Sequence, residues 1–390
     1  MSVLRQTVVI MAMATLVAVP VDGQAVRLDE PVAVFPEGFS VVQTVRELPD
    51  GRVLVADPLG QTVVAVDMAA GTADSIGRVG QGPEEYRQPD AVWPLPSGRT
   101  LLVDLGNGRL TELSSSLEFG DTRPYTIGES APGRELVLAI PQAVDGAGRV
   151  YFRSLGRPGP GMSGDSAQVL RIDLATEVVD SVAAIGLAER KTTTTGGPNN
   201  QNTSVTQVPL SPADAWGVAE DGRVVVARAG DYSIQWIAPN GQVTQGGPND
   251  YDAVAIRQGE KEEWAEVRAG SGGGLSLAVT NNNGVMSMSA SRGGGSNDDD
   301  LNQYDWPDVK PPFYSGRIIV DPSGRAWVRR HMKAGDPPTY DLFGADGVRV
   351  AQVEFAVGRR VVGFGNGALY AINTDQFGLQ HLEQYETPAG

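Results

Sequence analysis

The chain has 390 residues, a formal net charge of −16 at pH 7, no cysteine and only two histidines. The lack of cysteine excludes disulfides, iron–sulfur clusters, thiolate zinc sites and cysteine nucleophiles, and two histidines cannot build a multi-histidine metal centre. The acidic charge argues against nucleic acid and anionic bilayers as partners, and 49 glycines with 26 prolines indicate a chain rich in turns.

The N-terminus has the pattern of an export signal. Arg5 supplies a positive start, residues 7–19 are an uninterrupted run of apolar and small residues, and Gly23 and Ala25 stand where a signal peptidase needs small residues. The apolar run is too short to span a bilayer about 30 Å thick. We therefore expect a signal peptide at residues 1–25, and an extracytoplasmic protein (periplasmic or secreted) with no membrane segment after cleavage. The alternative is a buried N-terminal strand.

One motif recurs six times: a tight turn with glycine, followed by an alternating apolar strand. Three of the five intervals between the turn glycines are 43 to 50 residues, which is the length of a four-stranded propeller blade. Glycine accepts the positive φ that such turns require, and alternation is typical of a packed strand. The repeat predicts an all-β, six-bladed β-propeller of four-stranded antiparallel blades over residues 26–390, with a β-sandwich as the alternative. The turn glycines are Gly51, Gly98, Gly148, Gly222, Gly324 and Gly367.

Three segments carry a resemblance to a known family. Residues 53–67 and 77–92 resemble the NHL-type six-bladed β-propellers, and in particular their secreted bacterial branch. Residues 306–313 also resemble that branch. In this family a Gly-x-Gly-Pro-x-x-aromatic-x-x-Pro segment joins one blade to the next. The residues that match it are Gly80, Gly82, Pro83, Tyr86 and Pro89. The resemblance implies the propeller fold but says almost nothing about an activity.

The sixth repeat lacks an outer strand. Strands are expected near residues 359–364, 368–373 and 379–385, and the sequence then ends at Gly390. At the other end, residues 26–35 are alternating and apolar, ahead of an inner strand expected at 39–48. We expect residues 26–35 to supply the missing strand, because such pairing closes the ring and removes an exposed sheet edge.

Insertions lengthen the repeats near residues 156–164, 190–208 and 246–311. The last contains one short helix, expected at 253–268, followed by a Gly/Ser/Asn-rich tract at 270–297. We predict that this tract is a flexible loop, because it has little apolar surface to bury. The insertions are either plain surface loops or a lid or partner-binding arm over one face.

Two short motifs resemble ligand loops. Residues 159–164 match Gly-x-Gly-x-x-Gly, but no βαβ unit surrounds them, so we interpret them as a loop. Asp298, Asp300 and Asn302 have the first spacings of a calcium loop. Gln303 and Val309 replace its required glycine and glutamate, which excludes an EF-hand. A looser calcium site and a solvated acidic loop both stay open.

Five residues are candidates for ligand or partner binding. Arg329, Arg330 and His331 form the densest basic cluster, and the two arginines offer forked donors to an anion or carboxylate. The alternative is that they face solvent or pair with acids. Tyr304 and Trp306 precede a proline-rich segment and are candidate exposed aromatics.

We expect a binding module, non-catalytic and without a cofactor, for a protein, a small molecule or a carbohydrate on one loop face of the propeller. The alternative is a metal-dependent hydrolase or lactonase with a divalent cation such as calcium in the channel. Gluconolactonase-type propellers hold such an ion with Glu, Asn and Asp, and Asp57, Asp104 and Asn373 follow predicted strands here. A purely structural scaffold is a third hypothesis. We assign no catalytic or metal-binding residue, since the sequence has no Gly-x-Ser-x-Gly elbow or histidine-based triad motif.

Overall fold

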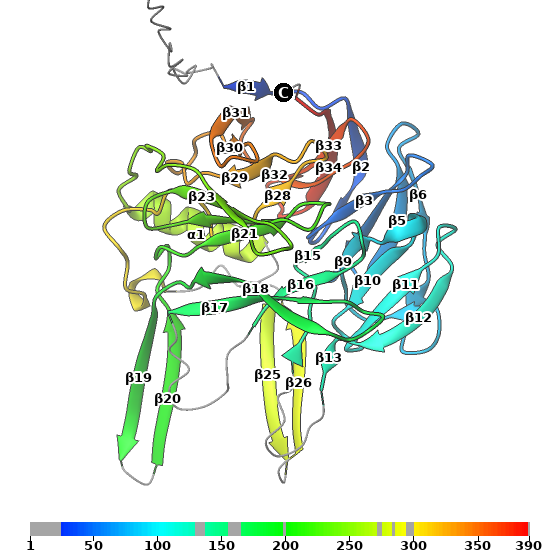
Figure 1. The fold of residues 1–390 in the computed structure, drawn as a ribbon, viewed down its shortest axis with the longest axis horizontal. Coiled ribbons are helices and arrows are strands. Elements are labelled where there is room, and N and C mark those ends of the chain that lie inside the picture. Colours follow the sequence, from blue (N-terminus) through cyan, green and yellow to red (C-terminus); the bar gives the residue numbers. More distant parts are fainter. Residues whose placement is uncertain are drawn as a thin grey trace, which may run out of the picture.

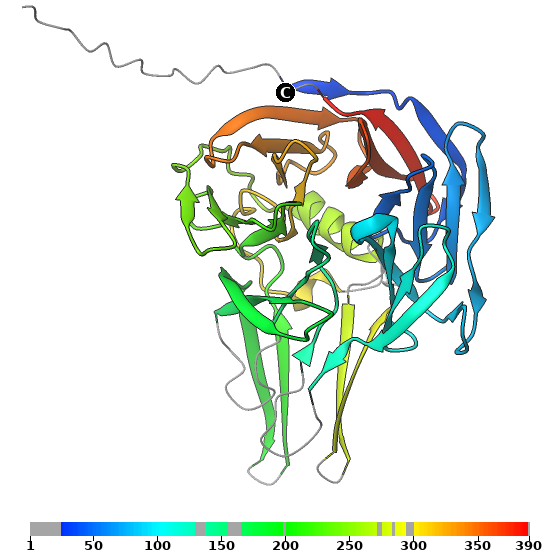
Figure 2. The same ribbon diagram turned by 45° about the vertical axis from the view of Figure 1, so that its right-hand side comes forward.

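A computed structural model describes residues 25–128, 137–154, 165–197, 200–270, 275–282, 285–293 and 300–388. In it, six antiparallel sheets surround a central channel as the blades of a propeller (Figures 1 and 2). The predicted all-β, six-bladed fold is therefore confirmed. The predicted signal peptide and the 156–164 insertion lie almost entirely outside the described residues.

The first three blades follow one another along the chain. Blade 1 contains β3 (Val45–Glu47), β4 (Val53–Asp57), β5 (Thr62–Asp67) and β6 (Thr72–Ser75). Blade 2 contains β9 (Pro89–Pro94), β10 (Thr100–Asp104), β11 (Arg109–Leu113) and β12 (Phe119–Pro124). Blade 3 contains β15 (Ala143–Val144), β16 (Val150–Arg153), β17 (Ser166–Ile172) and β18 (Val179–Gly186).

The last three blades complete the ring. Blade 4 contains β21 (Ala215–Val218), β22 (Val224–Arg228), β23 (Ser233–Ile237) and β24 (Val243–Gln245), with the short β27 (Gly316–Arg317) added in parallel to β21. Blade 5 contains β28 (Ile319–Val320), β29 (Ala326–Arg329), β30 (Thr339–Phe343) and β31 (Arg349–Phe355). Blade 6 contains β32 (Arg359–Phe364), β33 (Ala368–Thr374), β34 (Gln380–Glu386) and the N-terminal β2 (Ala33–Phe39).

The six repeat glycines lie in the turns between the first and second strands of their blades. All six have positive φ, between 73° and 86°. A residue with a Cβ rarely adopts this conformation, so the turn chemistry explains why glycine recurs at this position.

The core lies between the blades and not within them. Each of six clusters of buried apolar side chains joins two neighbouring sheets; Val55 of blade 1 and Tyr370 of blade 6 share one of these clusters. Central strands such as β4, β10 and β30 are buried along their whole length, because both faces of each sheet are covered by another blade.

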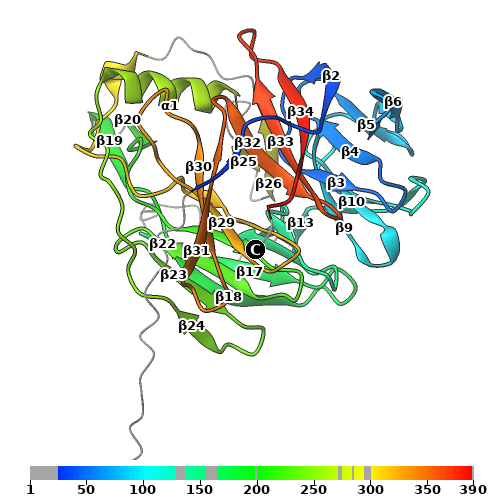
Figure 3. The ribbon, with the colours of Figure 1, turned by 90° about the horizontal axis from the view of Figure 1, so that it is seen from above.

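The N-terminus closes the ring, as expected. β2 pairs antiparallel with β34, from Ala33 opposite Gln384 to Phe39 opposite Gln380 (Figure 3). The closing strand lies further along the chain than predicted, because Phe35 and Phe39 both enter the core and stack with ring centroids 5.7 Å apart. The inner strand expected at 39–48 is correspondingly short, and β1 (Val26–Leu28) pairs instead with β31 of blade 5.

Small elements decorate the ring. The helix α1 (Gln258–Gly270) and the 3₁₀ turns η1 (Pro96–Gly98) and η2 (Leu301–Gln303) are its only helical segments within the described ranges. Two short sheets join β7 (Arg78–Val79) to β8 (Glu85–Tyr86) and β13 (Thr126–Ile127) to β14 (Val137–Leu138). Two hairpins project side by side beyond blade 3 (Figures 1 and 2). They are β19 (Arg190–Gly197) with β20 (Asn200–Gln207), and β25 (Leu275–Asn282) with β26 (Val285–Arg292).

The second hairpin corrects a prediction. Residues 270–297 were expected to form a flexible loop, yet β25 and β26 pair over their full length. The register places Leu277 opposite Ala290 and Val279 opposite Met288, so apolar residues alternate along both strands. The glycine- and serine-rich composition of the tract concealed this period of two. Of the calcium-like motif, Asp298 lies outside the described residues, and the Asp300 side chain caps η2 by accepting from the Asn302 amide at 3.0 Å.

Candidate functional site

Two cavities occupy the two ends of the central channel. Their volumes are about 580 and 540 Å³, and both are lined by Thr44, Trp93 and residues 317–319. These shared residues mark the waist of the channel. The larger cavity opens where the first and second strands of the blades turn, and we call it the turn end. The smaller one opens at the opposite face.

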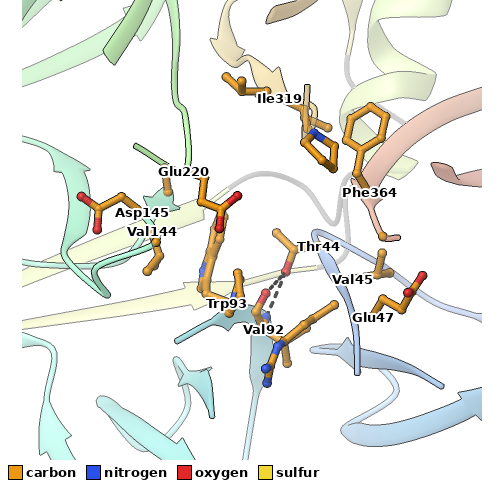
Figure 4. A pocket seen from close by; sticks show the side chains of 18 of the residues that line it. Thr44, Val45, Glu47, Val92, Trp93, Val144, Asp145, Glu220, Ile319 and Phe364 are labelled. Atoms are coloured by element: carbon orange, nitrogen blue, oxygen red, sulfur yellow. Dashed lines mark hydrogen bonds between the residues drawn. The ribbon is translucent and has the colours of Figure 1, made fainter. Parts of the chain in front are cut away.

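The turn end is acidic, and Figure 4 shows Glu47, Asp145 and Glu220 among the side chains that line it. It is lined by Glu47, Asp145, Glu220 and Asp321, together with two arginines. Asp145 accepts hydrogen bonds from the Arg149 Nε at 2.7 Å and the Tyr151 hydroxyl at 2.8 Å. Asp321 accepts in the same way from Arg325 and Trp327, and Glu47 accepts from the Tyr370 hydroxyl at 2.6 Å. Three of the four acids therefore fasten strands and turns.

The opposite end of the channel is cationic. Two aspartates and six arginines line it, and we call it the cationic end; the arginines are Arg153, Arg190, Arg292, Arg317, Arg329 and Arg360. They come from β16, β19, β26, β27, β29 and β32, so four of the six blades and both inserted hairpins contribute. A strongly acidic protein thus concentrates positive charge in a single cavity.

Both aspartates of the cationic end are already paired. Asp90 binds Arg292 through two contacts, Nε to Oδ1 at 2.5 Å and a second nitrogen to Oδ2 at 3.2 Å. Asp214 binds Arg228, which lies outside the cavity lining, at 2.8 Å. Neither carboxylate is left to neutralise the remaining arginines.

Five arginines have no carboxylate within 4 Å in the described part of the chain: Arg153, Arg190, Arg317, Arg329 and Arg360. Aromatic rings position two of them. The Arg317 guanidinium lies 4.9 Å from the centroid of Trp93, and that of Arg329 lies 4.3 Å from the centroid of Tyr314. Arg360 donates to the Val42 carbonyl at 2.8 Å. These contacts orient the guanidinium groups without neutralising their charge.

Burial lowers the pKa of three of these arginines, and neighbouring positive charges add to the effect. Desolvation by the channel walls lowers the pKa of Arg317 and of Arg360 to about 10, and the charge of Arg360 adds to the effect on Arg317. Desolvation, and then the charge of Arg190, lower the pKa of Arg153. All three of these arginines stay charged at neutral pH.

No family model matches this sequence, and no curated protein matches it. Solved structures do show a likeness. A Bacteroides fragilis protein that is thought to be exported is 13% identical, with a TM-score of 0.47 and coverage of 95% of this chain and 98% of its own. A regucalcin from Agrobacterium tumefaciens, described as calcium-binding, is 10% identical, with a TM-score of 0.41 and coverage of 93% and 96%.

A gluconolactonase from Xanthomonas campestris is likewise 10% identical, with a TM-score of 0.39 and coverage of 95% of this chain and 97% of its own. At such identities the likeness concerns the fold and carries no argument about activity. Function must therefore be argued from the site.

The basic cluster singled out from the sequence divides between the cavity and the core. Arg329 lines the cationic end. Arg330 is buried and binds Asp341 at 3.0 Å, and it also donates to the Pro312 carbonyl at 3.1 Å. His331 is buried behind the cavity wall and stacks on Tyr314 with ring centroids 3.8 Å apart. Of the three, only Arg329 is placed to contact a ligand.

The two aromatic candidates lie away from the channel. Tyr304 and Trp306 pack edge-to-face on Trp264 of α1, with centroid distances of 5.1 and 5.4 Å, and all three rings are half-buried. The Trp306 indole donates to the Leu301 carbonyl at 2.9 Å. This arrangement fastens the segment around η2 to the helix. These aromatic residues add no ligand to the calcium site that the sequence left open in this insertion.

Sequence reasoning missed five of the six arginines. A signal was present: Arg153 and Arg329 end the second strands of blades 3 and 5, and Arg360 lies near the start of the inner strand of blade 6. In a propeller these two positions of the repeat meet at the same face. Reading arginines by their place in the repeat, instead of by adjacency in the chain, would have assembled much of the site.

Two of the three residues considered for a channel metal, Asp57 and Asp104, bind backbone amides instead. The Asp57 carboxylate accepts from the backbone amides of Ser40 and Gly60, and the Asp104 carboxylate accepts from that of Gln88. Within the described ranges, no three Asp, Glu or His side chains gather in a way that could hold a metal ion. The same ranges contain no helix that is long and apolar enough to span a membrane.

Proposed function

We propose that the protein is an extracytoplasmic binding module that captures a small anionic molecule at the cationic end of its channel. One observation carries the proposal: five arginines that have no carboxylate partner in the described part of the chain converge on one cavity of a protein with a net charge of −16. The pattern of an export signal in residues 1–25 and the resemblance to secreted NHL-type propellers support the location.

The energetics support a ligand. Like charges in a partly desolvated cavity repel one another, so the gathering of these arginines destabilises the empty site. Guanidinium groups offer paired donors that match carboxylate, sulfate and phosphate oxygens. The cavity, at about 540 Å³, falls within the roughly 300–1,000 Å³ that is typical of small-molecule sites.

The sequence left a carbohydrate and a protein partner open as well. An acidic carbohydrate fits the site as proposed, because its carboxylate or sulfate groups supply the anion. The metal-dependent hydrolase has less support. The two carboxylates at the cationic end are each bound to an arginine, and the positive cavity repels a divalent cation.

The experiment measures binding of sulfate, phosphate and citrate to residues 26–390 by calorimetry. We expect at least one of these anions to bind, and the Arg329→Gln, Arg360→Gln double variant to weaken that binding tenfold or more. Arg27→Gln is the matched control, because its side chain is 68% exposed on β1 and does not line the cavity. Absence of binding by all three anions would overturn the proposal. A melting midpoint that rises with calcium or zinc but with no anion would favour the hydrolase.

A further inference from the structure

The helix α1 is attached to the propeller by polar contacts and not by a core. Of its 13 residues only Glu260 is buried, and the others are half-buried or exposed. An isolated helix of this length is marginal in water, because tertiary packing usually supplies most of the stability of a helix. The few contacts that hold α1 against the ring therefore decide whether it stays docked. The helix crosses the face at which the cationic end opens (Figure 2).

The first half of α1 is tied to the loop of blade 5 that follows β29. Glu260 accepts from the Ala334 backbone amide at 3.2 Å, and Glu263 pairs with Lys310 at 2.6 Å. Lys310 is 1% exposed, and its ammonium group also donates to the Met332 carbonyl at 2.8 Å. An ammonium group buried in this way needs both acceptors, so this attachment depends on Glu263.

The C-terminal end of α1 is tied to an arginine of the cationic end by three hydrogen bonds in a row. The Gln380 side chain is 2% exposed, and its nitrogen donates to the Gly270 carbonyl at 2.6 Å. Its oxygen accepts from the Val42 backbone amide at 2.8 Å. The Val42 carbonyl in turn accepts from the Arg360 guanidinium at 2.8 Å. The last carbonyl of the helix and a guanidinium group in the cavity are therefore held by the same buried residues.

The attachment of the first half also leads to an arginine of the cavity, through packed rings. Met332, which holds Lys310, directly follows His331 in the chain. His331 stacks on one side of the packing around Tyr314, with ring centroids 3.8 Å apart, and the Arg329 guanidinium lies 4.3 Å from the Tyr314 centroid. The Tyr314 backbone amide donates to the Arg329 carbonyl at 3.0 Å. Arg329 and the segment that anchors Lys310 thus belong to one packed unit.

We propose that α1 is a strap whose docking is coupled to the binding of an anion at the cationic end. In the empty site the positive charges of Arg329 and Arg360 are repelled by their neighbours, whereas a bound anion neutralises them in place. Their contacts with Tyr314 and Val42 are then retained, and with them both attachments of the helix. This inference rests on the proposed function, since it assigns a regulation to the same site. By linkage, a helix that docks more firmly when the anion is bound must in turn tighten the anion.

The test measures hydrogen exchange of the α1 amides in residues 26–390, with and without whichever of sulfate, phosphate and citrate binds most tightly. At saturation we expect the anion to slow exchange in α1 at least tenfold. Slowing by this factor means that the protein binds the anion at least tenfold more tightly with α1 docked than with α1 released. The amides of β6, an exposed outer strand of blade 1, are the internal reference and should not change.

Two variants cut the attachments separately. Gln380→Met removes the hydrogen bonds to Gly270 and Val42 at nearly constant volume. It should reduce the slowing in the C-terminal half of α1 to less than twofold and weaken anion binding threefold or more, although Gln380 does not line the cavity. Glu263→Gln should instead reduce the slowing in the first half of the helix. The matched control is Gln384→Met, the same change on the same strand, at a side chain with no hydrogen bond to α1 among the described residues.

The outcomes separate the two proposals. If none of the three anions binds, the proposed function fails. If an anion binds but exchange in α1 does not change, or slows equally in α1 and β6, the coupling fails alone. It also fails if a folded Gln380→Met protein keeps both the slowing and the affinity of the wild type, because Gln380 is then only structural. Melting curves confirm folding, and should Gln380→Met unfold, Glu263→Gln tests the coupling at a side chain that is 28% exposed.

Discussion

The buried histidine behind the cationic end makes stability depend on pH. His331 is 6% exposed, and desolvation, followed by the charges of Lys310, Arg329 and Arg330, lowers its pKa from 6.5 to about 3. The folded protein therefore holds the ring neutral throughout the range in which the unfolded chain takes up a proton. Below pH 6.5 the unfolded state binds more protons, so stability falls as the pH is lowered and is fully retained above that value.

The size of the effect follows from the two pKa values. Each pH unit below 6.5 costs about 1.4 kcal/mol until the folded-state pKa is reached. Between pH 7 and pH 5, His331 alone should therefore remove about 2 kcal/mol from the free energy of unfolding. His331→Phe keeps the stacking on Tyr314 and removes the titrating group, so this variant should lose about 2 kcal/mol less than the wild type over the same interval.

Urea unfolding of wild type, His331→Phe and the control His381→Gln at both pH values measures the difference. His381 is the other histidine of the chain, and it contacts Asp375 at 3.1 Å in a half-buried setting on β34. We expect the control to follow the wild type. If the wild type and His331→Phe lose equal stability between pH 7 and pH 5, the ring is protonated in the folded protein and the reasoning is refuted.

Three further predictions concern closure, the core and the charged cavity. Phe35→Ala on β2 should lower the free energy of unfolding, measured in urea, by about 3–5 kcal/mol. Val34→Ala, at an exposed position of the same strand, should lower it by less than about 0.5 kcal/mol. Equal effects of the two variants would mean that β2 does not close the ring. Asp341→Ala should cost about 3–5 kcal/mol, because it leaves Arg330 buried and unpaired; a loss below 1 kcal/mol would contradict this. Arg360→Gln should leave the melting midpoint of the ligand-free protein unchanged or raise it, since it relieves repulsion, and a clear fall would show that the charge stabilises the fold.

The fold could be predicted from the sequence because its repeat is local. A glycine turn and the strand that follows it occupy about ten residues, and each such unit forms the same hairpin whatever lies around it. Even the closure by the N-terminus follows from counting strands. The exact position of the closing strand could not be predicted in this way. The choice between residues 26–35 and Ala33–Phe39 depends on how Phe35 and Phe39 fit a core that the last blade supplies.

The site could be predicted only in part, because its residues are distant in sequence. Arg329 was found, since it stands in a dense basic cluster. Its neighbours in that cluster turn into the core, where Arg330 meets Asp341 and His331 meets Tyr314. The residues that join Arg329 at the cavity lie up to 176 positions away, at Arg153. Their convergence depends on the ring of blades and not on any local pattern.

The contrast between an acidic protein and a cationic cavity has a consequence for selectivity. A net charge of −16 repels large polyanions, which must approach the whole surface. A small anion that reaches the mouth of the channel meets five arginines that no carboxylate of the described residues neutralises. Salt screens charges over about 10 Å at 0.1 M, so the positive field is felt mainly within the mouth. α1 crosses the same face of the ring (Figure 2), and hydrogen bonds fasten it to Ala334 of blade 5 and to Gln380 of blade 6. The cavity walls and the acidic surface thus favour small ligands, and the arginines favour acidic ones.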